Sequence, residues 1–228
     1  LVISAGSALD LSWADAHVAA IIDSFYPGAR GGKAVAEAIF GDFSPSGKLP
    51  VTFYQGTENL PEFTDYDMSD RTYRYTDKNV LYPFGYGLHY GTIRYENAQI
   101  SCAQCSVRDA VDVSVDVINE SSYTIHESVQ AYIQHEEADA YEPGYQLKGI
   151  QTVTLQPKET KRVTISLKVR DFAIITQEGE CVVRPGSYRI AIGGQQPDAR
   201  SAKLTGSDVA ELVVRREGAQ TPVAVSYT

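Results

Sequence analysis

The sequence predicts an α/β fragment followed by an antiparallel β-sandwich, and three patterns carry that prediction. In residues 1–53, helix-spaced apolar residues lie between two short apolar runs, as in an α/β layer. After residue 95 the apolar period changes to two, which is the period of a strand with one wet face. Clusters of turn-forming residues then separate short alternating runs at even spacing, which is typical of a β-sandwich.

The α/β fragment is predicted to run strand, helix, helix, strand. A strand is expected over residues 1–4 and a helix over about 14–25, whose apolar residues recur at i, i+3, i+4 and i+7. That stripe consists of Val18, Ile21, Ile22 and Phe25. A second helix is expected over about 32–40, followed by a strand over 49–53. The residues that this second helix should bury are Val35, Ala38 and Ile39.

Residues 54–94 are predicted to form an irregular, aromatic-rich linker that packs on other domains. Long loops inside compact proteins are unusual unless they are functional or packed. The aromatic residues concerned are Tyr66, Tyr73, Tyr75, Tyr82, Phe84, Tyr86 and Tyr90. Each tyrosine combines a large apolar body with a hydroxyl that can find a partner, which favours packing.

Residues 95–228 are predicted to form the β-sandwich. Apolar and polar residues alternate in several short runs, and the expected strands are 111–117, 129–133, 163–167, 188–192 and 209–214. Turns such as Asn119-Glu120-Ser121-Ser122 and Arg184-Pro185-Gly186 separate them.

Composition excludes two classes of partner. Of the 228 residues, 43% are hydrophobic and 21% charged, which is close to the globular average. The net charge of −9 would repel polyphosphates, so no nucleic acid is expected. No apolar run approaches the roughly 20 residues of a membrane span, so no membrane is expected either.

The three cysteines predict free thiols. An odd count of Cys102, Cys105 and Cys181 does not indicate a disulfide framework. Cys102 and Cys105 have the spacing of half a zinc knuckle, but a structural zinc site needs four ligands and no second pair follows. No metal or cofactor is expected. Thiols suit a reducing compartment, so the cysteines favour a cytoplasmic location.

Several spaced motifs resemble the C-terminal part of a family-three glycoside hydrolase of the β-glucosidase or β-xylosidase type. The motifs similar to its α/β sandwich domain and following segment are residues 26–37, 40–42, 45–50, 67–68, 71–75 and 82–88. The stretches similar to its fibronectin type III-like domain are 127–134, 147–149, 155–163 and 183–193. Motifs in the family's order over nearly the whole chain are far more specific than any single one.

The resemblance implies an enzyme that removes terminal β-linked glucose or xylose from oligosaccharides or glycosides with net retention. Retention requires a nucleophile and an acid/base carboxyl about 5 Å apart. In the family, the nucleophilic Asp lies in an N-terminal barrel and the acid/base Glu earlier in the α/β domain. Neither motif matches this sequence, so no catalytic residue is assigned and the chain alone is expected to be inactive. Its expected partner is the N-terminal barrel portion, as a separate chain or a preceding segment, and the strand-like start at Leu1–Ser4 favours that view.

One cluster could touch substrate. Asp65, Asp67 and Arg71, with Asp70 nearby, place carboxylates and a guanidinium among aromatic residues, the groups that bind sugar hydroxyls and stack on sugar rings. The alternative is a solvated loop, with Arg71 paired to an acid and the tyrosines packed on a neighbouring domain.

Two non-enzymatic functions remain open from the residues alone. The β-sandwich could be a carbohydrate-binding module, or a structural module that stabilises the fold or a homo-oligomer. A dedicated binding module should show a row of aromatics at alternate strand positions, and no such row appears after residue 110.

Overall fold

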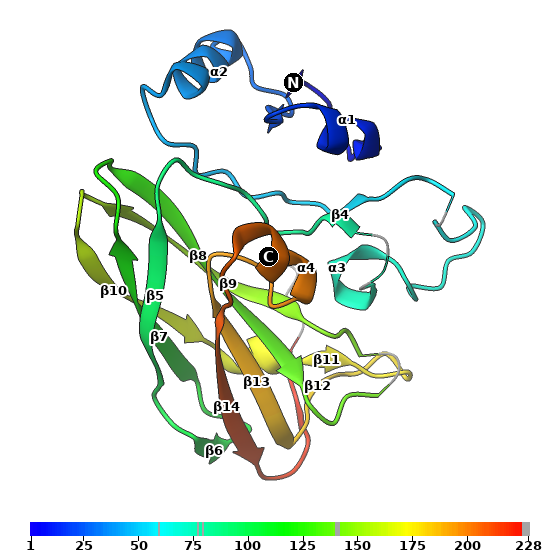
Figure 1. Ribbon diagram of the computed structural model, residues 1–228. Coiled ribbons are helices and arrows are strands. Elements are labelled where there is room, and N and C mark those ends of the chain that lie inside the picture. Colours follow the sequence, from blue (N-terminus) through cyan, green and yellow to red (C-terminus); the bar gives the residue numbers. More distant parts are fainter. Residues whose placement is uncertain (59, 77, 79, 140–141, 225–228) are drawn as a thin grey trace.

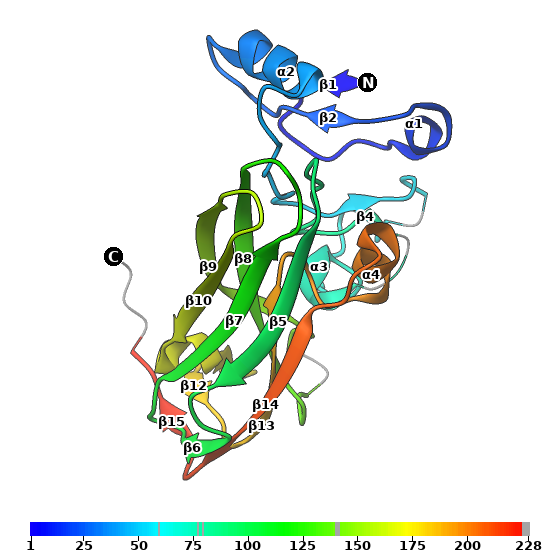
Figure 2. The same ribbon diagram turned by 60° about the vertical axis from the view of Figure 1, so that its left-hand side comes forward.

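The computed structural model describes residues 1–58, 60–76, 78, 80–139 and 142–224. The α/β elements at the N-terminal end lie beyond one end of a β-sandwich, and β6 lies at the opposite end (Figures 1 and 2). Within the described ranges, no helix has the length and apolar character needed to cross a membrane.

The N-terminal segment contains β1 (Val2–Ile3), α1 (Ser12–His17), β2 (Ile22–Asp23) and α2 (Gly31–Phe40). The helix predicted over about 14–25 is wrong in its second half. Residues of β2 pair in parallel with β1, Val2 opposite Ile22, and the helix stops at His17. The β-branched Ile21 and Ile22 prefer extended backbone when a partner strand is present, and that partner lies at the start of the chain.

The second predicted helix is confirmed as α2, although its buried face differs from the prediction. Ala38 is buried and Val35 half-buried, but Ile39 is 54% exposed. The helix ends at Gly41, whose φ of 80° is the left-handed conformation that favours glycine at a helix end.

The strand predicted over 49–53 is reduced to β3 (Phe53–Tyr54), which pairs with β4 (Val80–Tyr82). Leu49 instead exchanges two hydrogen bonds with the end of the linker. Its N–H donates to the carbonyl of Tyr86 at 2.8 Å, and its carbonyl accepts from the N–H of Gly85 at 2.7 Å. Pro50 has no N–H to donate, so it interrupts the backbone hydrogen bonding that a longer strand would need here. The linker also contains the short helix α3 (Thr72–Tyr75).

The predicted β-sandwich is confirmed. One sheet has the order β10-β7-β5, with bounds Thr160–Leu167, Val111–Asn119 and Ile93–Ile100. The facing sheet has the order β6-β14-β13-β8-β9, with bounds Gln104–Ser106, Ala210–Glu217, Gly186–Gly193, Ile125–His135 and Gln146–Leu155. Pairing is antiparallel except between β6 and β14. The expected strands lie in β7, β8, β10, β13 and β14, within a few residues of the predicted bounds.

A third, small sheet and two short helices complete the sandwich. The sheet has the order β11-β12-β15, with bounds Ile174–Ile175, Cys181–Val183 and Thr221–Pro222. A 3₁₀ helix, η1 (Val169–Phe172), precedes it. The helix α4 (Ala199–Thr205) begins at Asp198, whose side chain accepts a hydrogen bond from the N–H of Ser201. A helix this short carries too little periodicity to be predicted within a β-rich segment.

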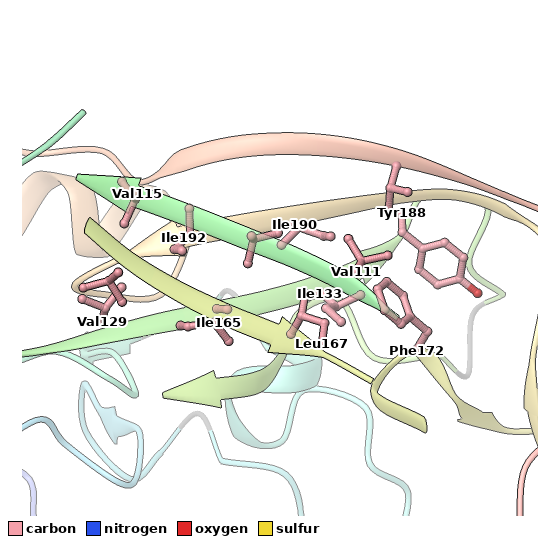
Figure 3. Close-up of a cluster of buried hydrophobic side chains, with 14 of the residues drawn as sticks. Val111, Val115, Val129, Ile133, Ile165, Leu167, Phe172, Tyr188, Ile190 and Ile192 are labelled. Carbon is pink, nitrogen blue, oxygen red and sulfur yellow. The ribbon is translucent and has the colours of Figure 1, made fainter. Parts of the chain in front are cut away.

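The core lies between the two main sheets. Side chains of β7 and β10 point toward those of β8 and β13 (Figure 3). In β7, Val111, Val113, Val115 and Val117 are all fully buried while the intervening residues are not. The period-two pattern in the sequence therefore marks the inward face of the strand.

Candidate functional site

The predicted cluster of Asp65, Asp67 and Arg71 lies on an exposed loop that Arg71 holds together. The guanidinium Nη2 donates to the carbonyl oxygens of Glu62 at 2.8 Å and Asp65 at 2.6 Å. Its Nε donates to the carbonyl of Asp67 at 3.0 Å. The structure thus brings the three residues together. The alternative in which Arg71 pairs with an acid is wrong in detail, because these contacts go to main-chain carbonyls.

The carboxylates of this loop organise its backbone. Asp65 Oδ1 accepts from the N–H of Asp67 at 3.0 Å, and Asp67 Oδ1 accepts from the N–H of Ser69 at 2.8 Å. Hydrogen bonds from the hydroxyl and the N–H of Ser69 hold the pKa of Asp67 below its ordinary value, and Arg71 adds to that effect. Asp67 is therefore a carboxylate at neutral pH, suited to accepting hydrogen bonds and unsuited to donating a proton.

Four of the linker aromatics stack on one another, and one of them also meets the β-sandwich. Tyr73 stacks on Phe84 with ring centroids 4.1 Å apart and meets Tyr132 of β8 edge-on at 6.3 Å. Tyr82 stacks on Tyr86 at 5.7 Å. Stacked and edge-on rings at these distances add to the stability from buried area.

Two aromatic rings of the loop do not pack in this way. Phe63 is 93% exposed and Tyr66 is 90% exposed, and Asp65 lies between them in the sequence. Both rings are available for stacking on a sugar ring, and the same loop carries the carboxylates of Asp65 and Asp67. The residues predicted for substrate contact therefore lie in a suitable setting, and their role stays a prediction.

Beneath the linker, a buried polar cluster joins the N-terminal segment to the β-sandwich. Its centre is Glu127 of β8, which is 1% exposed. Glu127 Oε1 lies 3.2 Å from Lys48 Nζ and accepts from the Tyr95 hydroxyl at 3.0 Å. Glu127 Oε2 lies 3.7 Å from His89 Nε2. Lys48 Nζ also donates to the carbonyl of Gly87 at 3.1 Å.

A second set of hydrogen bonds joins the end of the linker to the β-sandwich. Gln130 Nε2 donates to the carbonyls of Gly85 and Gly194, each at 3.1 Å, while its Oε1 accepts from the Tyr132 hydroxyl at 2.6 Å. The Arg200 guanidinium of α4 donates to the carbonyl of Leu81. The end of the linker is therefore anchored to β8 and α4 through fully or partly buried hydrogen bonds.

This cluster was not predicted, although the sequence contains a signal for it. Glu127 occupies an inward position of an alternating strand, between the fully buried Ile125 and Val129. A charged residue at such a position requires a buried partner, because an unpaired charge is costly to remove from water. Identifying Lys48 as that partner requires the tertiary fold.

The cluster predicts a pH dependence of stability. Burial lowers the pKa of His89 below its ordinary value of 6.5, and the attraction of Glu127 only partly opposes this. The unfolded chain therefore binds a proton at His89 more readily than the folded chain. Stability from this residue should be complete above pH 6.5 and decline as the pH falls below it.

Urea denaturation of the wild type and of His89→Gln between pH 7.5 and 5 checks this expectation. The wild type should lose stability faster than the variant as the pH falls. Parallel curves over that range would show that His89 does not contribute.

Comparisons with known proteins identify the family. Residues 1–90 match the model of the glycosyl hydrolase family 3 C-terminal domain, and residues 127–196 match that of the fibronectin type III-like domain. The chain carries the C-terminal domain of glycoside hydrolase family 3, followed by a fibronectin type III-like domain. Both matches fall in the order that the sequence motifs predicted, so the resemblance is confirmed.

Similar proteins of the family are named as glycosidases. A beta-xylosidase of Formosa agariphila is 33% identical over 88% of this chain and 29% of its own length. A xylan 1,4-beta-xylosidase of Xylanibacter ruminicola is 35% identical over 88% of this chain and 23% of its own length. A solved β-glucosidase of Erythrobacter marinus is 32% identical, with a TM-score of 0.79 over 95% of this chain and 28% of its own. The chain thus spans less than a third of the length of these relatives.

Proposed function

We propose that this family 3 chain is the C-terminal portion of a retaining β-glycosidase that hydrolyses terminal β-linked glucose or xylose from oligosaccharides or glycosides. Its role is to support the fold and the rim of the active site. The nucleophilic Asp and the acid/base Glu belong to an N-terminal portion that contains the barrel. Support for the activity comes from the named activities of the similar proteins.

The observation that carries the proposal is the distribution of exposed apolar side chains. Among the described residues, only four large exposed apolar side chains lie after residue 90: Tyr123, Ile150, Ile175 and Val213. Those within residues 1–90 are Leu1, Val2, Leu9, Trp13, Tyr26, Ile39, Phe40, Phe43, Val51, Leu60, Phe63, Tyr66, Met68, Leu88 and Tyr90. Exposed apolar surface concentrated in this way favours coverage by another protein segment.

The sheet of the N-terminal segment supports the same view. β1 and β2 form a two-stranded parallel sheet. Val2 of β1 and the preceding Leu1 are both exposed. Parallel sheets occur with both faces covered by other elements, and two strands alone are too few for independent stability. Additional strands and helices of an α/β domain would complete this layer.

The exposed loop fits a place at the rim of the site. Asp65 and Asp67 present carboxylates to sugar hydroxyls, Arg71 holds the loop in shape, and Tyr66 offers an exposed ring. In this proposal the three predicted residues touch or position substrate without forming or breaking a bond.

An assay on 4-nitrophenyl β-glucoside and β-xyloside tests the proposal. The purified chain should be inactive on both, and co-expression with the polypeptide encoded directly upstream should give a complex that hydrolyses at least one. The upstream polypeptide alone serves as control and should be less active than the complex. Hydrolysis by the isolated chain, or a co-expressed pair that neither associates nor hydrolyses, would overturn the proposal.

A further inference from the structure

Cys102 and Cys105 are three residues apart, at the end of the β-sandwich remote from the N-terminal segment (Figure 2). Both are half-buried and pack against the sandwich core, whereas Ala103 and Gln104 between them are exposed. Cys105 belongs to β6, and the chain bends at Ala103 just before that strand. The two side chains therefore turn inward together from positions i and i+3. Cys181 lies elsewhere, in β12.

The thiols adjoin a buried cation that is incompletely paired. Arg216 is the register partner of Cys105 across the β6–β14 pair, and it is 1% exposed. Its Nη2 donates to the carbonyls of Val107 and Asp109, each at 2.8 Å, and its guanidinium lies 4.0 Å from the ring centroid of Phe172. Its Nε and Nη1 are buried without a hydrogen-bond partner among the residues that the structure describes.

The surroundings of Cys105 favour its protonated thiol at neutral pH. Burial, followed by a hydrogen bond with Cys102, raises the pKa of Cys105 to about 11, and the charge of Arg216 opposes the rise. The i, i+3 spacing and packing against the same core bring Cys102 and Cys105 near each other, and the strand register places Cys105 opposite Arg216. A positive charge beside a thiol stabilises the thiolate, the form that attacks a disulfide.

We infer that Cys102 and Cys105 are a redox-active pair that closes reversibly into a disulfide, with Arg216 as the neighbouring charge. The oxidant is a small-molecule disulfide such as oxidised glutathione. One cysteine thiolate attacks a sulfur of the oxidant, forms a mixed disulfide and releases one glutathione thiolate. The second thiolate attacks the protein sulfur of that mixed disulfide and releases the other. The oxidant gains two electrons, and the two protons of the cysteines pass to the released glutathione thiolates, giving two glutathione thiols. This inference does not depend on the proposed glycosidase function, since the pair lies at the far end of the sandwich (Figure 2).

Thiol counting and mass spectrometry on the full chain test the inference. The reduced chain is equilibrated at pH 8 with mixtures of oxidised and reduced glutathione, quenched with N-ethylmaleimide, and analysed intact and after digestion. Two of the three cysteines should escape alkylation, the protein mass should fall by that of two hydrogen atoms, and a Cys102–Cys105 peptide should appear. The initial rate should rise about tenfold per pH unit below the thiol pKa.

Three single cysteine variants show which two thiols form the disulfide. Cys181→Ser should still lose both remaining thiols to an internal disulfide. Cys102→Ser and Cys105→Ser should each stop at a glutathione adduct, because the second thiolate is missing. Alkylation of all three cysteines at the most oxidising ratio, or two glutathione adducts at 102 and 105 without an internal bond, would overturn the inference.

Discussion

Replacement of Glu127 by alanine is expected to lower the free energy of unfolding by about 3–5 kcal/mol, the usual effect of breaking a buried ion pair by removing one partner. Lys48 would lose its carboxylate partner although its side chain is only 14% exposed. Tyr95 would lose the acceptor of its hydroxyl. Chemical denaturation followed by circular dichroism measures the change.

Two controls separate this effect from a general sensitivity to lost charge. Glu37→Ala removes a carboxylate paired with Lys33 on the exposed surface of α2 and should change stability by less than about 0.5 kcal/mol. Lys48→Met combined with Glu127→Leu removes both charges and should recover part of the loss. A loss below about 1 kcal/mol for Glu127→Ala would show that the cluster does not stabilise the junction.

Replacement of Phe172 by alanine is expected to cost about 3–5 kcal/mol of unfolding free energy, as is usual for truncation of a buried phenylalanine. Phe172 is 2% exposed and lies against two large groups of the core. Its ring meets that of Tyr188 edge-on at 5.3 Å, and the Arg216 guanidinium covers it at 4.0 Å. The variant would leave a cavity and remove the aromatic face beneath a buried cation.

The same denaturation measurement checks this second expectation. Ile175→Ala is the matched control, because Ile175 lies close in sequence but its side chain is exposed. Its effect should stay within about 0.5 kcal/mol. Equal effects of the two substitutions would contradict the assignment of Phe172 to the core.

The β-sandwich could be predicted from sequence because its strands bury one face each. Val111 to Val117 alternate with polar residues, and that local pattern is sufficient to define the strand and its inward side. The segment around Ile22 shows the opposite case. Its apolar spacing fits a helix, yet pairing with Val2 determines its conformation. A partner distant in sequence cannot be identified from a local window.

The candidate site was predictable only in part. Asp65, Asp67 and Arg71 are close in sequence, so their placement on one loop could be predicted, but the three carbonyls that Arg71 binds depend on how the loop folds. The pairing of Lys48 with Glu127 joins two parts of the chain that only the tertiary structure brings together. Lys48 and Glu127 each lie within a stretch that resembles the family, at 45–50 and 127–134. Their contact could not be predicted from their positions in the sequence.

The central claim is that this chain shapes a glycosidase site without supplying a catalytic carboxylate. The most direct test is the co-expressed complex carrying Asp65→Asn, Asp67→Asn and Asp70→Asn together, assayed on the 4-nitrophenyl glycoside that the unmodified complex hydrolyses. We expect a raised KM with kcat reduced less than about tenfold, since only positioning contacts are weakened. A fall in kcat of about 10⁴-fold or more, with the complex still assembled, would place a catalytic carboxylate in this chain and contradict the account.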